Sequence, residues 1–120
     1  MPHKKLEAWK KSIDFVTEIY KLTKIFPKSE TFGLTQQMKR SAISIPSNIA
    51  EGCSRKSCIE TIQFLYIATS SVSELETQLI IANKVDYIAD EDTEIMLKSL
   101  NEIKRMLIGL IKSLKTKSPK

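Results

Sequence analysis

The chain has 120 residues, of which 42% are hydrophobic and 28% are charged, and it contains three Gly and four Pro. This composition is too apolar for a disordered chain and too poor in turn-forming residues for a many-stranded β protein. We predict a single all-α domain over residues 1–120, with an ordered core at about residues 5–114 and a frayed basic tail from Lys115 to Lys120.

Charge is distributed unevenly along the sequence. The net charge is +5, but five acidic residues lie within residues 86–94, which leaves nineteen basic against nine acidic residues, or +10, for the rest. This excess permits binding of nucleic acid or another polyanion, although solubility alone also accounts for a net charge of this size. Because the sequence shows neither the apolar run of a secretory signal nor an uncharged run of the ~20 residues that span a bilayer, we expect a cytoplasmic protein without membrane contact.

The first predicted helix runs from about Leu6 to Lys24 and carries two apolar stripes. Both have the three-and-four spacing of one helix side, and they comprise Leu6, Trp9, Ile13, Val16, Tyr20 and Thr23, and Ala8, Ser12, Phe15, Ile19, Leu22 and Phe26. Two sides of this helix therefore need cover. Pro27 and the turn around Gly33 end the element.

The second predicted helix begins near Thr35 and ends at Gly52, which is a good C-terminal stop. Its apolar face comprises Leu34, Met38, Ala42, Ile45 and Ile49. Proline cannot donate a hydrogen bond to the carbonyl one turn earlier, and its ring crowds that turn. We therefore predict that the helix is kinked or broken at Pro46.

The third predicted helix starts at a capping box, in which Ser57 and Glu60 can each satisfy a free backbone N–H, and it ends near Asn83. Its heptad seam comprises Leu65, Ala68, Val72, Leu75, Leu79 and Ala82. Further apolar residues lie off this seam, namely Ile59, Tyr66, Ile67, Ile80 and Ile81. A helix with apolar residues on more than one side is buried more completely at a subunit interface than in a small monomeric bundle.

The fourth predicted helix starts in the cluster Asp90-Glu91-Asp92, where acidic side chains oppose the positive end of the helix dipole, and it continues to about Leu114. Its seam comprises Met96, Leu100, Ile103, Leu107, Leu110 and Leu114. Four helices joined by short connections predict an antiparallel up-and-down four-helix bundle.

The sequence contains no recognisable enzyme or metal site. The only histidine, His3, lies outside the predicted helices, and Cys53 and Cys58 alone cannot complete a four-ligand zinc site. No base accompanies a nucleophilic Ser or Cys, Gly-rich phosphate loops are absent, and Glu74 and Glu76 point to different sides of one helix. We predict no catalytic residue, no metal and no cofactor, and we expect both thiols to be reduced.

The most distinctive stretch is Ser44-Ile45-Pro46-Ser47-Asn48-Ile49-Ala50-Glu51-Gly52, and it has two interpretations. In the structural one, Ser44, Ser47 and Asn48 pair with backbone groups that the proline frees, and Gly52 ends the helix. In the other, Asn48 and Glu51 form a partner-binding spot. The first is favoured because side-chain rescue of an interrupted helix is the commoner use of such residues.

The candidate nucleic-acid-binding residues are basic side chains on the second helix, on the following loop and on the outward side of the fourth helix. They are Lys39, Arg40, Arg55, Lys56, Lys98, Arg105 and Lys112. The alternative is that they form a solvated surface, as on any bundle helix. Aromatic residues do not alternate with these charges along the sequence, so stacking on bases is not indicated and any binding would be mainly to the phosphate backbone.

Motifs spread over the first three predicted helices form a family pattern. They are Trp9, Tyr20, Phe26-Pro27-x-x-Glu30-x-x-Gly33-Leu34-x-x-Gln37, the stretch from Ser44 to Gly52, Phe64-Leu65-x-Ile67-Ala68 and Glu74-Leu75-Glu76-Thr77-Gln78. Over about residues 5–114 the chain resembles the four-helix-bundle proteins encoded in intervening sequences of bacterial 23S ribosomal RNA genes. Cys53 and Cys58 lie outside the pattern and are assigned no role.

The resemblance implies a homo-oligomer, a ring-like homopentamer, with a role in binding RNA or other nucleic acid and no established reaction. A pentamer would cover the apolar sides of the first and third helices. It would also gather five charges of +5, or +25, on one particle, so that weak phosphate contacts add. The runner-up is a protein-interaction scaffold, because related pentameric bundles act as accessory subunits of reverse transcriptases in diversity-generating retroelements.

Overall fold

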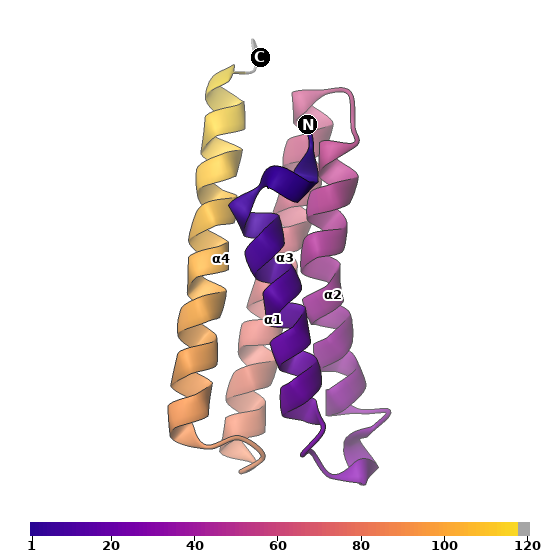
Figure 1. The fold of residues 1–120 in the computed structure, drawn as a ribbon, viewed down its shortest axis with the longest axis vertical. Helices are drawn as coiled ribbons and strands as arrows, with labels where there is room; N and C mark the ends of the chain where they lie inside the picture. Colours follow the sequence, from indigo (N-terminus) through magenta and orange to yellow (C-terminus); the bar gives the residue numbers. More distant parts are fainter. Residues whose placement is uncertain (118–120) are drawn as a thin grey trace.

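A computed structural model describes residues 1–117 of the chain. It shows four α-helices lying side by side along a body of 50 × 24 × 21 Å (Figure 1), and the described residues contain no β-strand. The helices are α1 (Glu7–Thr23), α2 (Leu34–Cys53), α3 (Cys58–Lys84) and α4 (Asp90–Lys117), and 3₁₀ turns cover His3–Lys5 and Lys28–Glu30. The all-α prediction is confirmed, and the four helices are consistent with a four-helix bundle.

Each helix packs against the next in the chain, and α4 also packs against α1. No Cα atoms of the diagonal pairs, α1 with α3 and α2 with α4, approach within 8 Å in the described part of the chain. Figure 1 shows the N-terminus and the end of α4 at one end of the molecule, and the connection from α3 to α4 at the other. None of the helices within residues 1–117 is long and apolar enough to cross a membrane.

α1 buries one of its two predicted stripes and leaves the other partly open. Phe15 and Ile19 of the second stripe are buried, whereas Ile13 and Tyr20 of the first stripe are each 39% exposed. Trp9 lies between these extremes and is half-buried. The reason is that, apart from the 3₁₀ turn His3–Lys5, α1 packs only against α2 and α4 within residues 1–117, which leaves its third side open.

α2 runs without interruption through Pro46, so the alternative of a break at this residue is wrong, and the kink stays a prediction. The Asn48 amide donates to the Ser44 carbonyl at 2.8 Å and to the Ser44 hydroxyl at 2.9 Å. The Ser71 hydroxyl of α3 donates to that same hydroxyl at 2.7 Å. None of these bonds reaches the carbonyl of Ala42, which loses its helical partner at Pro46, so the predicted pairing with freed backbone groups is not observed within residues 1–117. Ser47 is exposed and makes no side-chain hydrogen bond within residues 1–117.

Gly52 brings α2 and α3 close together instead of ending α2. The helix continues to Cys53, and no described glycine has a positive φ angle. A Cβ atom at Gly52 would lie 2.9 Å from the Cβ of Phe64 and 3.1 Å from the Thr61 carbonyl oxygen. The Thr61 hydroxyl also donates to the Gly52 carbonyl at 2.8 Å. The glycine therefore permits a helix contact that a larger residue would prevent.

α3 starts where the capping box predicts, because the Ser57 hydroxyl accepts a hydrogen bond from the Glu60 N–H at 3.2 Å. The predicted seam of α3 is buried. The off-seam residues are between 41% and 57% exposed, namely Ile59, Tyr66, Ile67, Ile80 and Ile81. The outer side of α3 is thus an apolar face that no other element covers within residues 1–117.

α4 differs from its prediction at its C-terminal end. Ile111 is buried while Leu110 is only half-buried, because a straight helix of 3.6 residues per turn drifts away from a strict heptad. α4 continues to Lys117, beyond its predicted end near Leu114, while fraying of the tail stays a prediction. Residues 118–120 lie outside the described part of the chain.

Candidate nucleic-acid interface

The predicted phosphate-binding residues lie on different sides of the bundle. They are Lys39 and Arg40 on α2, Arg55 and Lys56 in the loop of residues 54–57, and Lys98, Arg105 and Lys112 on α4. α2 and α4 are diagonal, with no Cα atoms within 8 Å of each other in the described residues, so their outward residues do not form one continuous surface.

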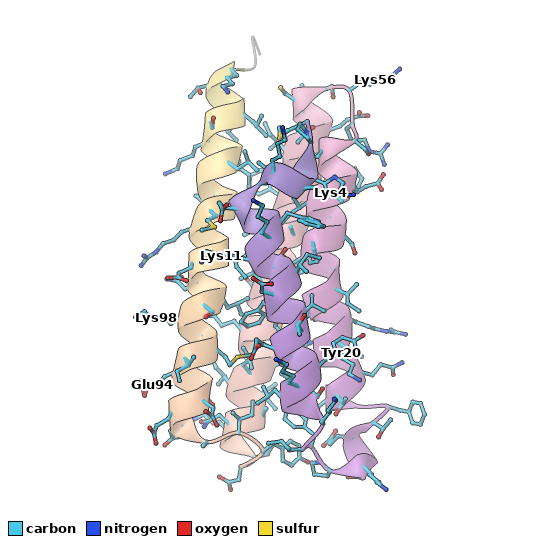
Figure 2. All side chains as sticks on the ribbon, in the orientation of Figure 1. Lys4, Lys11, Tyr20, Lys56, Glu94 and Lys98 are labelled. Carbon is cyan, nitrogen blue, oxygen red and sulfur yellow. The ribbon has the colours of Figure 1, made fainter. Side chains whose placement is uncertain are left out.

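Basic side chains gather instead at the end of the bundle that carries both termini. Three segments lie there, residues 1–6, residues 54–57 and residues 111–117, and none of them contains Asp or Glu. Figure 2 shows Lys4 and Lys56 at this end. The basic side chains of these segments, called the basic end below, are Lys4, Lys5, Arg55, Lys56, Lys112, Lys115 and Lys117.

Contacts between different helices hold the segments of the basic end in place. The N-terminal ammonium of Met1 donates to the Cys53 carbonyl at the end of α2, at 3.2 Å. The Lys115 ammonium donates to the Tyr66 hydroxyl of α3 at 2.8 Å. Within residues 1–117, Arg55 is the one member of the basic end that forms an ion pair, with Glu51 at 2.6 Å. The remaining cations therefore keep charge that an anion can neutralise.

The opposite end of the bundle has an excess of acidic residues, although Lys24, Lys28 and Lys84 also lie there. Residues 85–94 connect α3 to α4 and begin α4, and they contain Asp86, Asp90, Glu91, Asp92 and Glu94 but no basic residue. Charge is consequently polarised along the 50 Å axis of the molecule. A polyanion is attracted to one end of such a body and repelled from the other.

Aromatic rings meet cations in space although they do not alternate with them in sequence. The Lys39 ammonium lies 4.5 Å from the centre of the Tyr20 ring, and the Arg55 guanidinium lies 4.7 Å from the centre of the Phe64 ring. Each pair joins two different elements, so sequence spacing could not reveal it. These protein cations lie over the ring faces on which a base would stack, which favours phosphate contacts over base stacking.

The carboxylate of Glu30 joins the two loops at the acidic end. It accepts hydrogen bonds from the Leu34 N–H at 3.0 Å and from the Tyr87 hydroxyl at 2.8 Å. The bond from Leu34, and to a smaller extent the bond from Tyr87, lowers the pKa of Glu30. The bond to Glu30, together with burial, raises the pKa of Tyr87. A Cβ atom at Gly33 would lie 2.8 Å from a Glu30 carboxylate oxygen, so glycine leaves room for this contact.

Other reactive groups do not assemble into a site. No cluster of three His, Cys, Asp or Glu residues within residues 1–117 could hold a metal ion. Cys53 and Cys58 are free thiols, and the Cys53 sulfur lies 3.8 Å from the sulfur of Met1. Burial raises the pKa of the Cys53 thiol, and the N-terminal ammonium offsets part of this effect.

Comparison with known proteins decides the family. The family model described as 23S rRNA-intervening sequence protein matches residues 4–109. The chain belongs to this family. The crystal structure of a protein with unknown function from the S23 ribosomal protein family of Bacteroides thetaiotaomicron is similar to it, with 31% sequence identity and a TM-score of 0.81. The similarity covers 88% of this chain and 98% of that chain, whereas no curated protein matches.

In this chain, several residues of the family motifs make contacts that maintain the bundle. Glu30 and Gly33 connect the loops at the acidic end, and Gly52 lies at the closest approach of α2 and α3. Ser44 and Asn48 are bonded to each other and, through Ser71, to α3. These residues thus act within the fold, and among them Gly52 adjoins the basic end, because its carbonyl accepts a hydrogen bond from the Arg55 N–H at 3.1 Å.

Sequence reasoning missed the lysines near the two termini of the 23S rRNA-intervening sequence protein. Lys4 and Lys5 precede α1, and Lys115 and Lys117 fall in a segment expected to fray. A usable signal was present in the sequence, because residues 1–6 and 111–117 contain basic residues and no acidic ones. The sequence alone does not show that these segments lie at the same end of the folded chain.

Proposed function

We propose that this 23S rRNA-intervening sequence protein is a non-enzymatic, oligomeric module that binds RNA or other nucleic acid through the phosphate backbone. The basic end is the observation that carries this proposal, since its three segments contain no acidic residue. Cations that neutralise phosphates release condensed counterions, which provides affinity without reading the base sequence. The predicted basic residues along the sides of the bundle stay candidates for additional contacts.

The proposal includes a homo-oligomer, and the family resemblance points to a ring-like pentamer of up-and-down bundles acting in the cytoplasm. Two apolar faces support side-by-side contacts. One is the groove between α1 and α2, of about 300 Å³, which Trp9, Ile13 and Ile43 help to line. The other is the exposed outer side of α3. Because these faces differ, a contact between them joins unlike surfaces, and repetition of such a contact gives a ring when the rotation between neighbours closes after a whole number of subunits.

A salt titration with matched variants tests nucleic-acid binding. Labelled single-stranded RNA and duplex DNA are titrated at several salt concentrations with the wild type and two triple variants. The basic-end variant carries Lys5→Gln, Lys115→Gln and Lys117→Gln, and the control carries Lys24→Gln, Lys28→Gln and Lys84→Gln, all at exposed positions.

The expected result follows from counterion release. Three lost phosphate contacts reduce the slope of log K against log salt on single strands by roughly 2, at about 0.7 per contact. The control variant has the same net charge and should keep the wild-type slope. Absence of binding at low salt, or equal slopes for the two variants, would refute the proposal.

Mass measurement in solution tests the assembly separately. A monomer at micromolar concentration would contradict the proposed ring. In a ring, Trp9→Ser should lower the mass, because Trp9 lies in the groove between α1 and α2. Phe32→Ser is the matched control, since Phe32 lies in a loop and is 86% exposed.

A protein-interaction scaffold, such as an accessory subunit of a reverse transcriptase, is the second candidate. The exposed apolar face of α3 favours it, because such faces mark sites of protein contact. Recovery of one protein partner after nuclease treatment, with no binding of purified RNA, would support this candidate over the first.

A further inference from the structure

The groove between α1 and α4 combines apolar and acidic residues. Two adjoining cavities, of about 150 Å³ and 310 Å³, lie along it, and Glu18 lines both. Leu22 and Met96 contribute apolar surface to the larger cavity. Ile95 also lines this larger cavity, and its side chain is 64% exposed.

Carboxylates dominate the charge of this groove. Asp14, Glu18, Asp92 and Glu102 line the two cavities, against two lysines, Lys11 and Lys21. Glu18 pairs with Lys21 at 3.6 Å, whereas the other three carboxylates form no ion pair within residues 1–117. A groove of net negative charge is unexpected in a chain of net charge +5.

We infer that the groove between α1 and α4 binds a basic amphipathic helix of a partner protein. The apolar side of such a helix would cover the exposed Ile95 and the half-buried Leu22. Lysine or arginine residues beside that apolar stripe would meet Asp14, Asp92 and Glu102. The inference goes beyond the proposed function, because this groove repels nucleic acid and is separate from the basic end.

A second copy of the chain fits this groove less well than a separate partner does. The most basic helical segment of the chain is residues 111–117, at the end of α4. The apolar residues of that segment, Ile111 and Leu114, are already buried in their own bundle. A copy of α4 therefore cannot offer a basic and an apolar side together without unfolding.

Peptide binding to paired charge variants tests the inference. The probe is a fluorescent, helical peptide of Leu and Lys with an amphipathic pattern, and the matched peptide has Glu in place of Lys. The groove variant carries Asp14→Asn, Asp92→Asn and Glu102→Gln. The control carries Glu60→Gln, Glu74→Gln and Asp86→Asn, which change net charge equally at exposed positions outside the groove.

The Leu–Lys peptide should bind the wild type and the control with similar affinity, and the groove variant about tenfold more weakly. The Leu–Glu peptide should not bind. No binding of the Leu–Lys peptide, or equal binding to both variants, would overturn the inference. So would a peptide that dissociates the wild-type oligomer, because the groove would then be a contact between copies of this chain.

A single apolar substitution tests the other half of the inference. Ile95→Ser should weaken binding of the Leu–Lys peptide by about fivefold, since the peptide would cover that side chain. Ile25→Ser is the matched control, because Ile25 is 74% exposed and does not line the groove. Equal affinities of these two variants would show that binding is electrostatic only and would contradict docking in the groove.

Discussion

The contact between α2 and α3 at Gly52 leaves no room for a methyl group. A Cβ atom there would lie 2.9 Å from the Cβ of Phe64 and 3.1 Å from the carbonyl oxygen of Thr61. Both atoms are attached rigidly to the backbone of α3, so relief requires one helix to move away from the other. We expect Gly52→Ala to destabilise the fold, although alanine has the higher helix propensity.

Two opposing effects set the size of this destabilisation. Overpacking of a buried contact costs about 1–3 kcal/mol. Alanine recovers at most about 1 kcal/mol relative to glycine in a helix, and less in a terminal turn. The net loss should be about 1–2 kcal/mol, which lowers Tm by roughly 3–10 °C for a domain of this size.

Gly109 offers the same substitution without the clash. A Cβ atom at Gly109, within α4, meets no atom within 4 Å, so only the propensity effect remains. Gly109→Ala should therefore stabilise the protein by about 0.5–1 kcal/mol. Thermal and urea unfolding should be compared at one protein concentration, because association raises Tm with concentration. The reasoning fails if Gly52→Ala melts at or above the wild type, or if Gly109→Ala melts below it.

The remaining predictions concern a carboxylate, an amide and two thiols. Because the pKa of Glu30 is lowered from 4.5, its contribution to stability is full above that value and is lost as pH falls through the lower folded pKa. Melting between pH 3 and pH 7 should show this loss for the wild type but not for Glu30→Gln, and Tyr87→Phe should shift the loss to higher pH. Asn48→Ala should cost about 0.5–1.5 kcal/mol in urea unfolding, and Asn48→Asp more, because a carboxylate cannot donate to the carbonyl that the amide contacts. A thiol reagent should modify Cys58 before Cys53, whose burial and raised pKa protect it, and equal rates would contradict this order.

The helices were predictable where their signals are local. Ser57 caps α3 at the expected place, and acidic residues from Asp90 onward begin α4. The end of α4 was predicted too early, near Leu114. Residues 115–117 contain no glycine or proline that would stop the helix. Pro46 was expected to allow a break, yet α2 is continuous and packs the proline ring in the interior of the bundle.

Features of one helix that depend on its contacts with another helix were not predictable from its own sequence. α1 has two similar stripes, and the positions of α2 and α4 decide that Phe15 is buried while Ile13 is exposed. Gly52 resembled a helix stop, but its role comes from Phe64 across the interface. The basic end has the same origin, since it joins three segments that are far apart in sequence.

The charge polarity of the bundle decides which assembly could use the basic end. In the proposed ring, contacts between the sides of neighbouring subunits keep their long axes roughly parallel, so all basic ends lie on one face of the particle. A two-fold axis perpendicular to the bundles would instead place each basic end beside an acidic end and weaken the field at both. Multivalent binding of one nucleic-acid chain requires the first geometry. The basic end of one subunit has eight cations, namely the N-terminal ammonium and the side chains of Lys4, Lys5, Arg55, Lys56, Lys112, Lys115 and Lys117. One such end can therefore supply a salt slope of at most about −6 on single strands. A slope steeper than this limit is informative if it persists in a variant whose basic residues on the sides of the bundle are neutralised, namely Lys39, Arg40, Lys98 and Arg105. One strand would then have to contact several basic ends, and the subunits would have to be parallel.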